Sequence, residues 1–176
     1  MDLAAQPPRR RAIRALAMSC MSVRQSGFLF DLALFAVRIV LAWIFVYYGA
    51  GKLFGSFNGP GLHQTAVFFS KTAHLDPGGF FAVFGGVMEF GGGIALALGI
   101  LSRLAGIALF ADMVMAMITV TWVNGFNSAT VNPGYELNIA IGVLALTVAL
   151  VGAGRISVDA MIVRRLSKRD DGASTD

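Results

Sequence analysis

Four apolar stretches, each close to the length that a lipid bilayer demands, constrain this chain more than any other feature of its sequence. They cover residues 29–54, 80–101, 104–123 and 135–151. A transmembrane helix needs about 20 mostly apolar residues to cross a hydrocarbon core of about 30 Å. Only 14% of all residues are charged, against about 25% in a typical soluble domain. The sequence therefore predicts an all-α fold, a four-helix transmembrane bundle with short connections, seated in the lipid bilayer.

The distribution of basic residues predicts the orientation of these spans. Arginines and lysines gather in residues 1–25, at Arg103 between the second and third spans, and in the C-terminal tail. The opposite side of the bundle carries only Lys52 and Lys71. Basic residues concentrate on the cytoplasmic side of membrane proteins. We therefore expect both termini in the cytoplasm (N-in, C-in) and a multi-pass location in a bacterial plasma membrane.

The same pattern divides the chain into three parts. A basic cytoplasmic tail covers residues 1–25, the four-helix membrane domain covers 26–160, and a basic and then acidic cytoplasmic tail covers 161–176. The net charge of +4 resides in the tails, where it sets topology and suits docking to a partner or to anionic lipid. It does not indicate binding of nucleic acid.

The loop between the first two spans has an internal pattern of its own. Glycines and prolines punctuate residues 55–61 and 77–79, as they do at the ends of connecting segments. Between them, apolar residues recur in 62–75 at helical spacing. This spacing is consistent with a short helix lying on the membrane surface, and an ordinary loop stays open as the alternative.

Three of the spans each carry a charged residue at bilayer depth: Arg38, Glu89 and Asp112. Such a charge costs at least about 2.5 kcal/mol unless it is paired, hydrated or neutralised. Consecutive spans run antiparallel, so we expect Arg38 and Glu89 at similar depth and Asp112 within reach. The guanidinium fork can bind both oxygens of a carboxylate. Two interpretations stay open: an ion pair that fixes helix register, or a polar site for a proton, a quinone headgroup or a small anion.

A second polar group is expected at the outer ends of the helices. It comprises Lys52, Glu136 and Asn138. A carboxylate in the first turn of a helix is favoured by the helix dipole, so Glu136 has a structural role available. The alternative is an outer polar mouth that also includes Asn124 and Asn132. Tyr47, Tyr48 and Trp122 could line this mouth, but we expect these rings chiefly as anchors at the membrane interface.

The residues that usually hold redox groups or metals are scarce. The one cysteine, Cys20, cannot form an internal disulfide or a C-x-x-C pair. His63 and His74 fall in the loop rather than in any span, so we do not expect a haem held between the helices. Two histidines are too few for a zinc site. We expect no metal site and no evident cofactor, while a bound quinone stays open.

An ordered set of short motifs resembles the DoxX family of small four-helix bacterial membrane proteins over about residues 30–160. The matching features are Arg38, Gly-Ala-Gly-Lys-Leu-Phe at 49–54, Glu89 in a glycine-rich span, Leu-Gly-Ile-Leu-Ser-Arg at 98–103, Gly-Tyr-Glu-Leu at 134–137 and Gly-Ala-Gly-Arg-Ile-Ser-Val-Asp at 152–159.

The resemblance implies an association with quinol oxidases, with quinone-coupled thiosulfate oxidation, or with soluble enzymes of oxidative and sulfur stress. The expected function is an integral membrane subunit that anchors or assembles such a redox or sulfur-handling complex, without catalysis of its own. Its expected partners are soluble redox or sulfur-transfer enzymes at the cytoplasmic face, and a homo-oligomer stays open. The alternatives are a quinone-reactive oxidoreductase subunit with a buried Arg/Glu/Asp site, and a small-molecule transporter or channel.

Overall fold

The computed structural model describes residues 27–127 and 133–162, and throughout these residues the regular elements are helices. They are α2 (Phe28–Phe54), η2 (Ser56–Asn58), α3 (Gly61–Lys71), α4 (Gly78–Leu98), α5 (Ser102–Ala116), η3 (Met117–Thr121), η4 (Trp122–Asn124) and α6 (Glu136–Val151). The all-α prediction is therefore confirmed. The predicted N-terminal tail and most of the predicted C-terminal tail lie outside the described residues.

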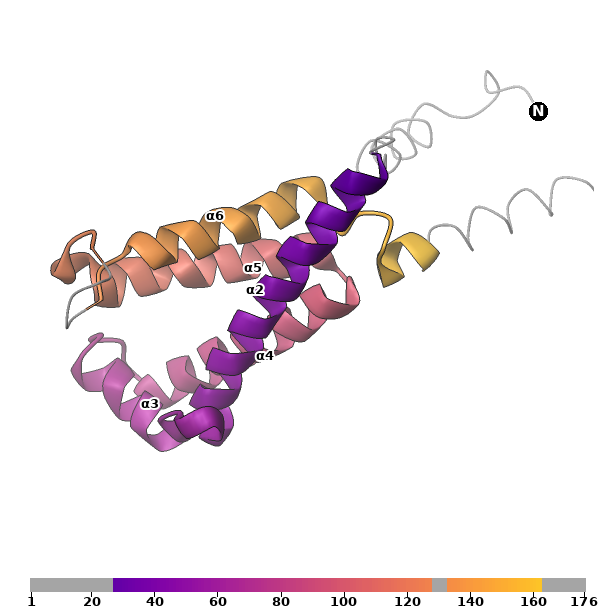
Figure 1. Cartoon of the computed structure of the whole chain (residues 1–176). Coiled ribbons are helices and arrows are strands. Elements are labelled where there is room, and N and C mark those ends of the chain that lie inside the picture. The colour runs from indigo at the N-terminus through magenta and orange to yellow at the C-terminus, as the bar shows by residue number, and fades with distance from the viewer. Residues whose placement is uncertain (1–26, 128–132, 163–176) are drawn as a thin grey trace, which may run out of the picture.

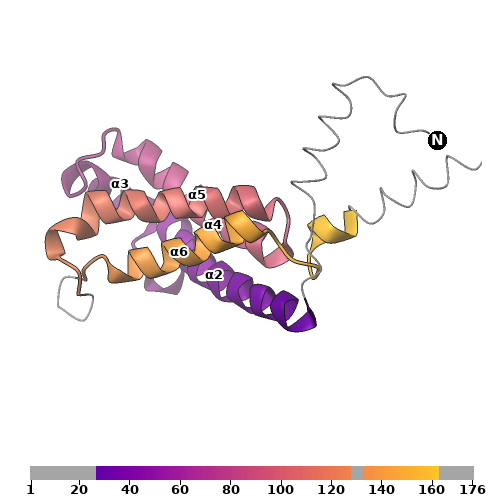
Figure 2. The same cartoon turned by 90° about the horizontal axis from the view of Figure 1, so that it is seen from above.

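Three of the helical segments are long and apolar enough to cross a membrane. They are Phe28–Phe54, Gly78–Leu98 and the continuous segment Ser102–Asn124, while α6 is a shorter apolar helix of 16 residues. The start of α2, the turn between α4 and α5, and the segment after α6 lie at one end of the molecule (Figures 1 and 2). Helix α3 and the connection from α5 to α6 lie at the other end.

The helices pack as two close pairs, α2 with α4 and α5 with α6. Glycines allow the backbones to approach. A Cβ on Gly49 would lie 2.5 Å from the backbone nitrogen of Phe90, and one on Gly106 would lie 2.8 Å from the carbonyl oxygen of Ala145. Small residues at helix contacts are the usual means of close packing in membranes. The core between the pairs consists of Leu41, Ala42, Phe45, Leu96, Ala105, Leu109, Ala145 and Val148.

The segment after α2 forms the helix α3, rather than the ordinary loop that the sequence left open. Helix α3 packs against α4. At the start of α4 the backbones are in direct contact, and the Gly78 amide donates a hydrogen bond of 3.1 Å to Ser70 Oγ. The side chain of Thr65 is buried on the inner side of α3. Helix α3 is therefore a packed wall of the domain at this end.

Candidate functional site

The register of α2 against α4 decides which charged groups meet. Gly49 lies against Phe90, and this register brings Glu89 beside the last turns of α2. There the ammonium of Lys52 binds the carboxylate, with 2.5 Å between Nζ and Oε1. The Glu89 side chain is only 3% exposed and that of Lys52 is 28% exposed. Glu89 is therefore paired with Lys52 and not, as the sequence suggested, with Arg38.

Arg38 lies at the opposite end of the same helix pair. Its guanidinium contacts Leu96 and Ala97 of α4, which lie about 11 Å beyond Glu89 along the helix axis at the α-helical rise. The reason is that the first turns of α2 extend beyond the end of α4. The buried guanidinium donates hydrogen bonds of 2.6–3.3 Å to the backbone carbonyls of Leu96, Ala97, Ala153 and Ile156.

These contacts make Arg38 a structural clamp. The last carbonyls of a helix have no partner within the helix, and Arg38 supplies donors to two of them at the end of α4. Two aspartates make further hydrogen bonds at this end of the helices. Asp159 accepts hydrogen bonds from the amides of Leu101 and Ser102 at the start of α5, and the buried Asp31 accepts one from the amide of Arg155. The segment after α6 is thereby fixed to the ends of α2, α4 and α5.

Asp112 of α5 completes the group around Glu89. The two carboxyl groups are within hydrogen-bond contact of each other. Among the described residues, neither Glu89 Oε2 nor Asp112 Oδ2 has a hydrogen-bond donor, although both atoms are buried. We refer to Lys52, Glu89 and Asp112 as the polar cluster. The sequence left Asp112 within reach of an Arg38–Glu89 pair, whereas the structure pairs Glu89 with Lys52 and gives Arg38 backbone partners instead.

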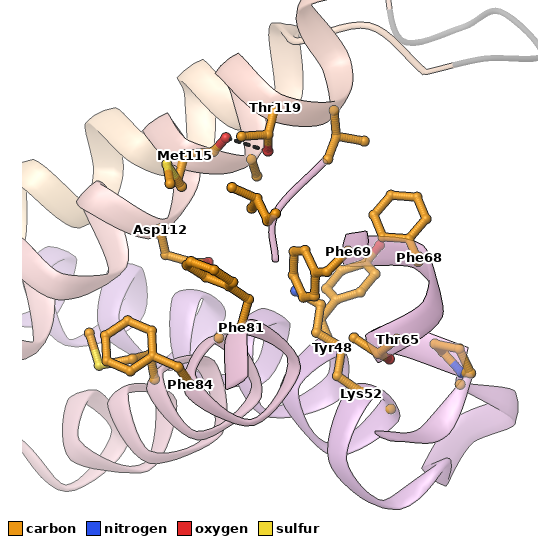
Figure 3. Close-up of a pocket in the computed structure, with 18 of the residues that line it drawn as sticks. Tyr48, Lys52, Thr65, Phe68, Phe69, Phe81, Phe84, Asp112, Met115 and Thr119 are labelled. Atoms are coloured by element: carbon orange, nitrogen blue, oxygen red, sulfur yellow. Dashed lines mark hydrogen bonds between the residues drawn. The ribbon is translucent and has the colours of Figure 1, made fainter. Parts of the chain in front are cut away.

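The polar cluster borders a half-open cavity of about 990 Å³ lined by α2, α3, α4 and the α5–η3 helix. Lys52 and Asp112 line it, whereas Glu89 lies behind them. Figure 3 shows Asp112, Met115 and Thr119 on one wall, facing α3. The aromatic residues of the lining are Tyr47, Tyr48, Phe57, Phe68, Phe69, Phe81 and Phe84. Small-molecule sites are typically apolar cavities of about 300–1,000 Å³ with a few convergent polar groups, and this cavity has both properties.

One wall of the cavity is made by an irregular helical segment. After α5 the chain continues as the π-helical turn η3 and the 3₁₀ turn η4, and Thr119, Val120 and Thr121 line the cavity. Isolated π-helical turns inside α-helices occur frequently at functional sites. No sequence pattern had marked this turn.

The predicted outer mouth of Lys52, Glu136 and Asn138 is divided by the structure. Lys52 joins the polar cluster. Asn138 Oδ1 accepts a hydrogen bond of 3.2 Å from the hydroxyl of Thr121, so it supports the cavity wall without being part of the lining. Glu136 is in the first turn of α6, where a carboxylate is favoured by the helix dipole. Of the three rings considered for that mouth, Tyr47 and Tyr48 line the cavity, whereas Trp122 stacks on Tyr135 and is not part of the lining. Asn132 lies outside the described residues.

Membrane-length helices that line an apolar cavity and hold a buried charge cluster define a helical integral membrane protein. Within that class, the DoxX family model matches residues 33–122, and the chain belongs to the DoxX family. The matched region contains Lys52, Glu89 and Asp112. Comparison with curated proteins and with solved structures gave no match.

Proposed function

We propose that this DoxX protein is the membrane subunit of a quinone-linked redox assembly and that its cavity binds the ring of a quinone-class molecule. The observation that supports this proposal is the cavity of about 990 Å³, with aromatic walls and two charged groups, Lys52 and Asp112, at one point of its lining. A lipid-soluble quinone combines an apolar ring and tail with carbonyl oxygens. The apolar walls match the ring, and the ammonium of Lys52 is a donor for a ring oxygen.

The aromatic lining fits a flat ring in particular. Tyr47 and Phe57 stack with ring centroids 4.9 Å apart and an angle of 19° between the ring planes, and both border the cavity. Offset stacking of aromatic groups contributes about 0.5–1.5 kcal/mol beyond the burial of area. A third ring placed against this pair gains the same kind of contact.

The proposal includes an orientation. The start of α2 and the segment after α6 share one end of the molecule (Figure 1), and the excess of basic residues in the tails favours the cytoplasm for that end. The cavity then lies in the outer half of the four-helix domain. Electrons would pass between the quinone and a partner enzyme. The anchoring role that the resemblance implies depends on tails outside the described residues, so the binding role is the better supported one.

A binding titration tests the proposal. The full chain in lipid nanodiscs is titrated with a short-chain quinone by calorimetry. Ala111→Trp places a large ring at a position that lines the cavity. Ala140→Trp makes the same change at an exposed position on α6 that is not part of the lining. We expect at least tenfold weaker binding in Ala111→Trp and unchanged binding in Ala140→Trp. Equal affinity in all three proteins, or no binding to the original chain, would refute the proposal.

A further inference from the structure

The polar cluster contains one cation and two acids, and it has more buried acceptor atoms than donors to satisfy them. Lys52 donates to Oε1 of Glu89. The second oxygen of Glu89 and Oδ2 of Asp112 are buried without a donor from any described residue. A buried acceptor that lacks a partner is destabilising, so a group other than the described side chains should donate to these two atoms.

The contact between the two carboxyl groups limits which group can donate a hydrogen bond to their buried oxygens. Two ionised carboxylates repel each other, and neither can donate a hydrogen bond. Paired carboxyl groups in proteins therefore share one proton. A proton placed between Glu89 and Asp112 forms an O–H···O⁻ bond, which belongs to the strong, charge-assisted class. With the ammonium of Lys52, the cluster then has no net charge, as its apolar surroundings require.

We propose that Glu89 and Asp112 hold one shared proton and that Asp112 delivers it to an oxygen of the molecule bound in the cavity. Asp112 is the acid of the pair that lines the cavity, whereas Glu89 lies behind it. Once the partner enzyme of the proposed function has supplied electrons to the bound quinone, its oxygen is basic enough to take the proton. The O–H bond of the pair then breaks, its electron pair stays on the carboxylate, and a new O–H bond forms on the reduced quinone. The ammonium of Lys52 then faces two carboxylates and stabilises the pair until it is protonated again.

Among the described residues that line the cavity, Lys52 and Asp112 are the charged ones, and Tyr47 and Tyr48 add two phenol groups. Helix α2 contributes Lys52 and α5 contributes Asp112, and these two are the charged groups that act on Glu89. Helix α3 contributes Gln64 and Thr65 to the cavity, both uncharged. The shared proton does not depend on the proposed function, but its delivery does.

Infrared spectroscopy of the full chain in nanodiscs at neutral pH tests the shared proton. A protonated carboxyl group has a C=O band that moves on exchange into heavy water. We expect this band in the original chain, its loss in Asp112→Asn and in Glu89→Gln, and its retention in Glu136→Gln. Asp112→Asn should fold, because its amide donates to Glu89 in place of the proton. No such band, or a band that survives both cluster substitutions, would overturn the shared proton.

Addition of the short-chain quinone tests the delivery. We expect the C=O band to shift when quinone binds and to stay unchanged in Ala111→Trp. A band that does not move while calorimetry records binding would overturn delivery by Asp112 and leave the proposed function standing. If calorimetry records no binding but the band depends on Asp112, the proposed function and the delivery step fail together and the shared proton holds.

Discussion

Replacing Arg38 with methionine removes four hydrogen bonds from a point where four backbone carbonyls converge. Two of the four hydrogen bonds, to Leu96 and Ala153, are fully buried. The Leu96 carbonyl keeps the hydrogen bond from the Gly99 amide, so the Ala153 carbonyl is the one left without a donor among the described residues, at a cost of about 1–3 kcal/mol. Removal of a buried guanidinium also relieves its desolvation cost. We therefore expect a loss of about 1–2 kcal/mol in the free energy of unfolding.

A loss of that size is a large fraction of the roughly 5–15 kcal/mol that stabilises a typical domain. It is measured by reversible denaturant unfolding in mixed micelles. Arg103→Met is the matched control, because it removes an exposed arginine near the same turn, and changes at exposed sites usually stay within about 0.5 kcal/mol. Arg38→Lys should recover part of the loss, since an ammonium restores up to three donors. If Arg38→Met and Arg103→Met unfold at the same denaturant concentration, the clamp does not stabilise the fold.

Three further predictions follow from the same contacts. Lys52→Met should destabilise the domain by about 3–5 kcal/mol, because it leaves the carboxylate of Glu89 buried and unpaired; Glu89→Gln in the same chain should restore most of the melting temperature, and no recovery would count against the pairing. Gly49→Ala should lower the melting temperature because its Cβ would meet the backbone of α4, whereas Gly91→Ala, with no atom within 4 Å of its Cβ, should not. A chain that stops at Val151 should yield far less folded protein by size-exclusion chromatography than one that stops at 162, and equal yields would show that the segment after α6 is dispensable.

The helical nature of the chain was predictable because it follows from one physical requirement. In a bilayer, backbone amides and carbonyls must be satisfied within the segment itself, which leaves helices or closed barrels. Long apolar stretches therefore identify helices such as α2 and α4 within a few residues of their ends. The fourth stretch is less decisive, since α6 has 16 residues against the roughly 20 of a typical span.

The partners of the buried charges were not predictable in the same way. Depth counted from the ends of the apolar stretches placed Arg38 level with Glu89, but helix ends do not fix register. The close approach at Gly49 fixes it, and it shifts α2 past the end of α4. Lys52 was thereby moved from an expected interface position to a buried ion pair. A glycine on the contact face of a helix is the sequence signal that could have predicted this register. The sequence contains 21 glycines, which are too many to identify Gly49 as the one at the contact.

The distinction between the two buried charge sites rests on how much of their hydrogen-bonding capacity is used. Arg38 has five N–H donors, and four of its hydrogen bonds go to backbone carbonyls, so little capacity remains for a ligand. Asp112 lines a cavity and has a buried oxygen that no described residue satisfies. A saturated buried charge stabilises a fold, whereas an unsaturated one beside a cavity can bind or exchange a proton. By this criterion Arg38 holds the structure together, and Lys52, Glu89 and Asp112 are the residues for which we propose a function.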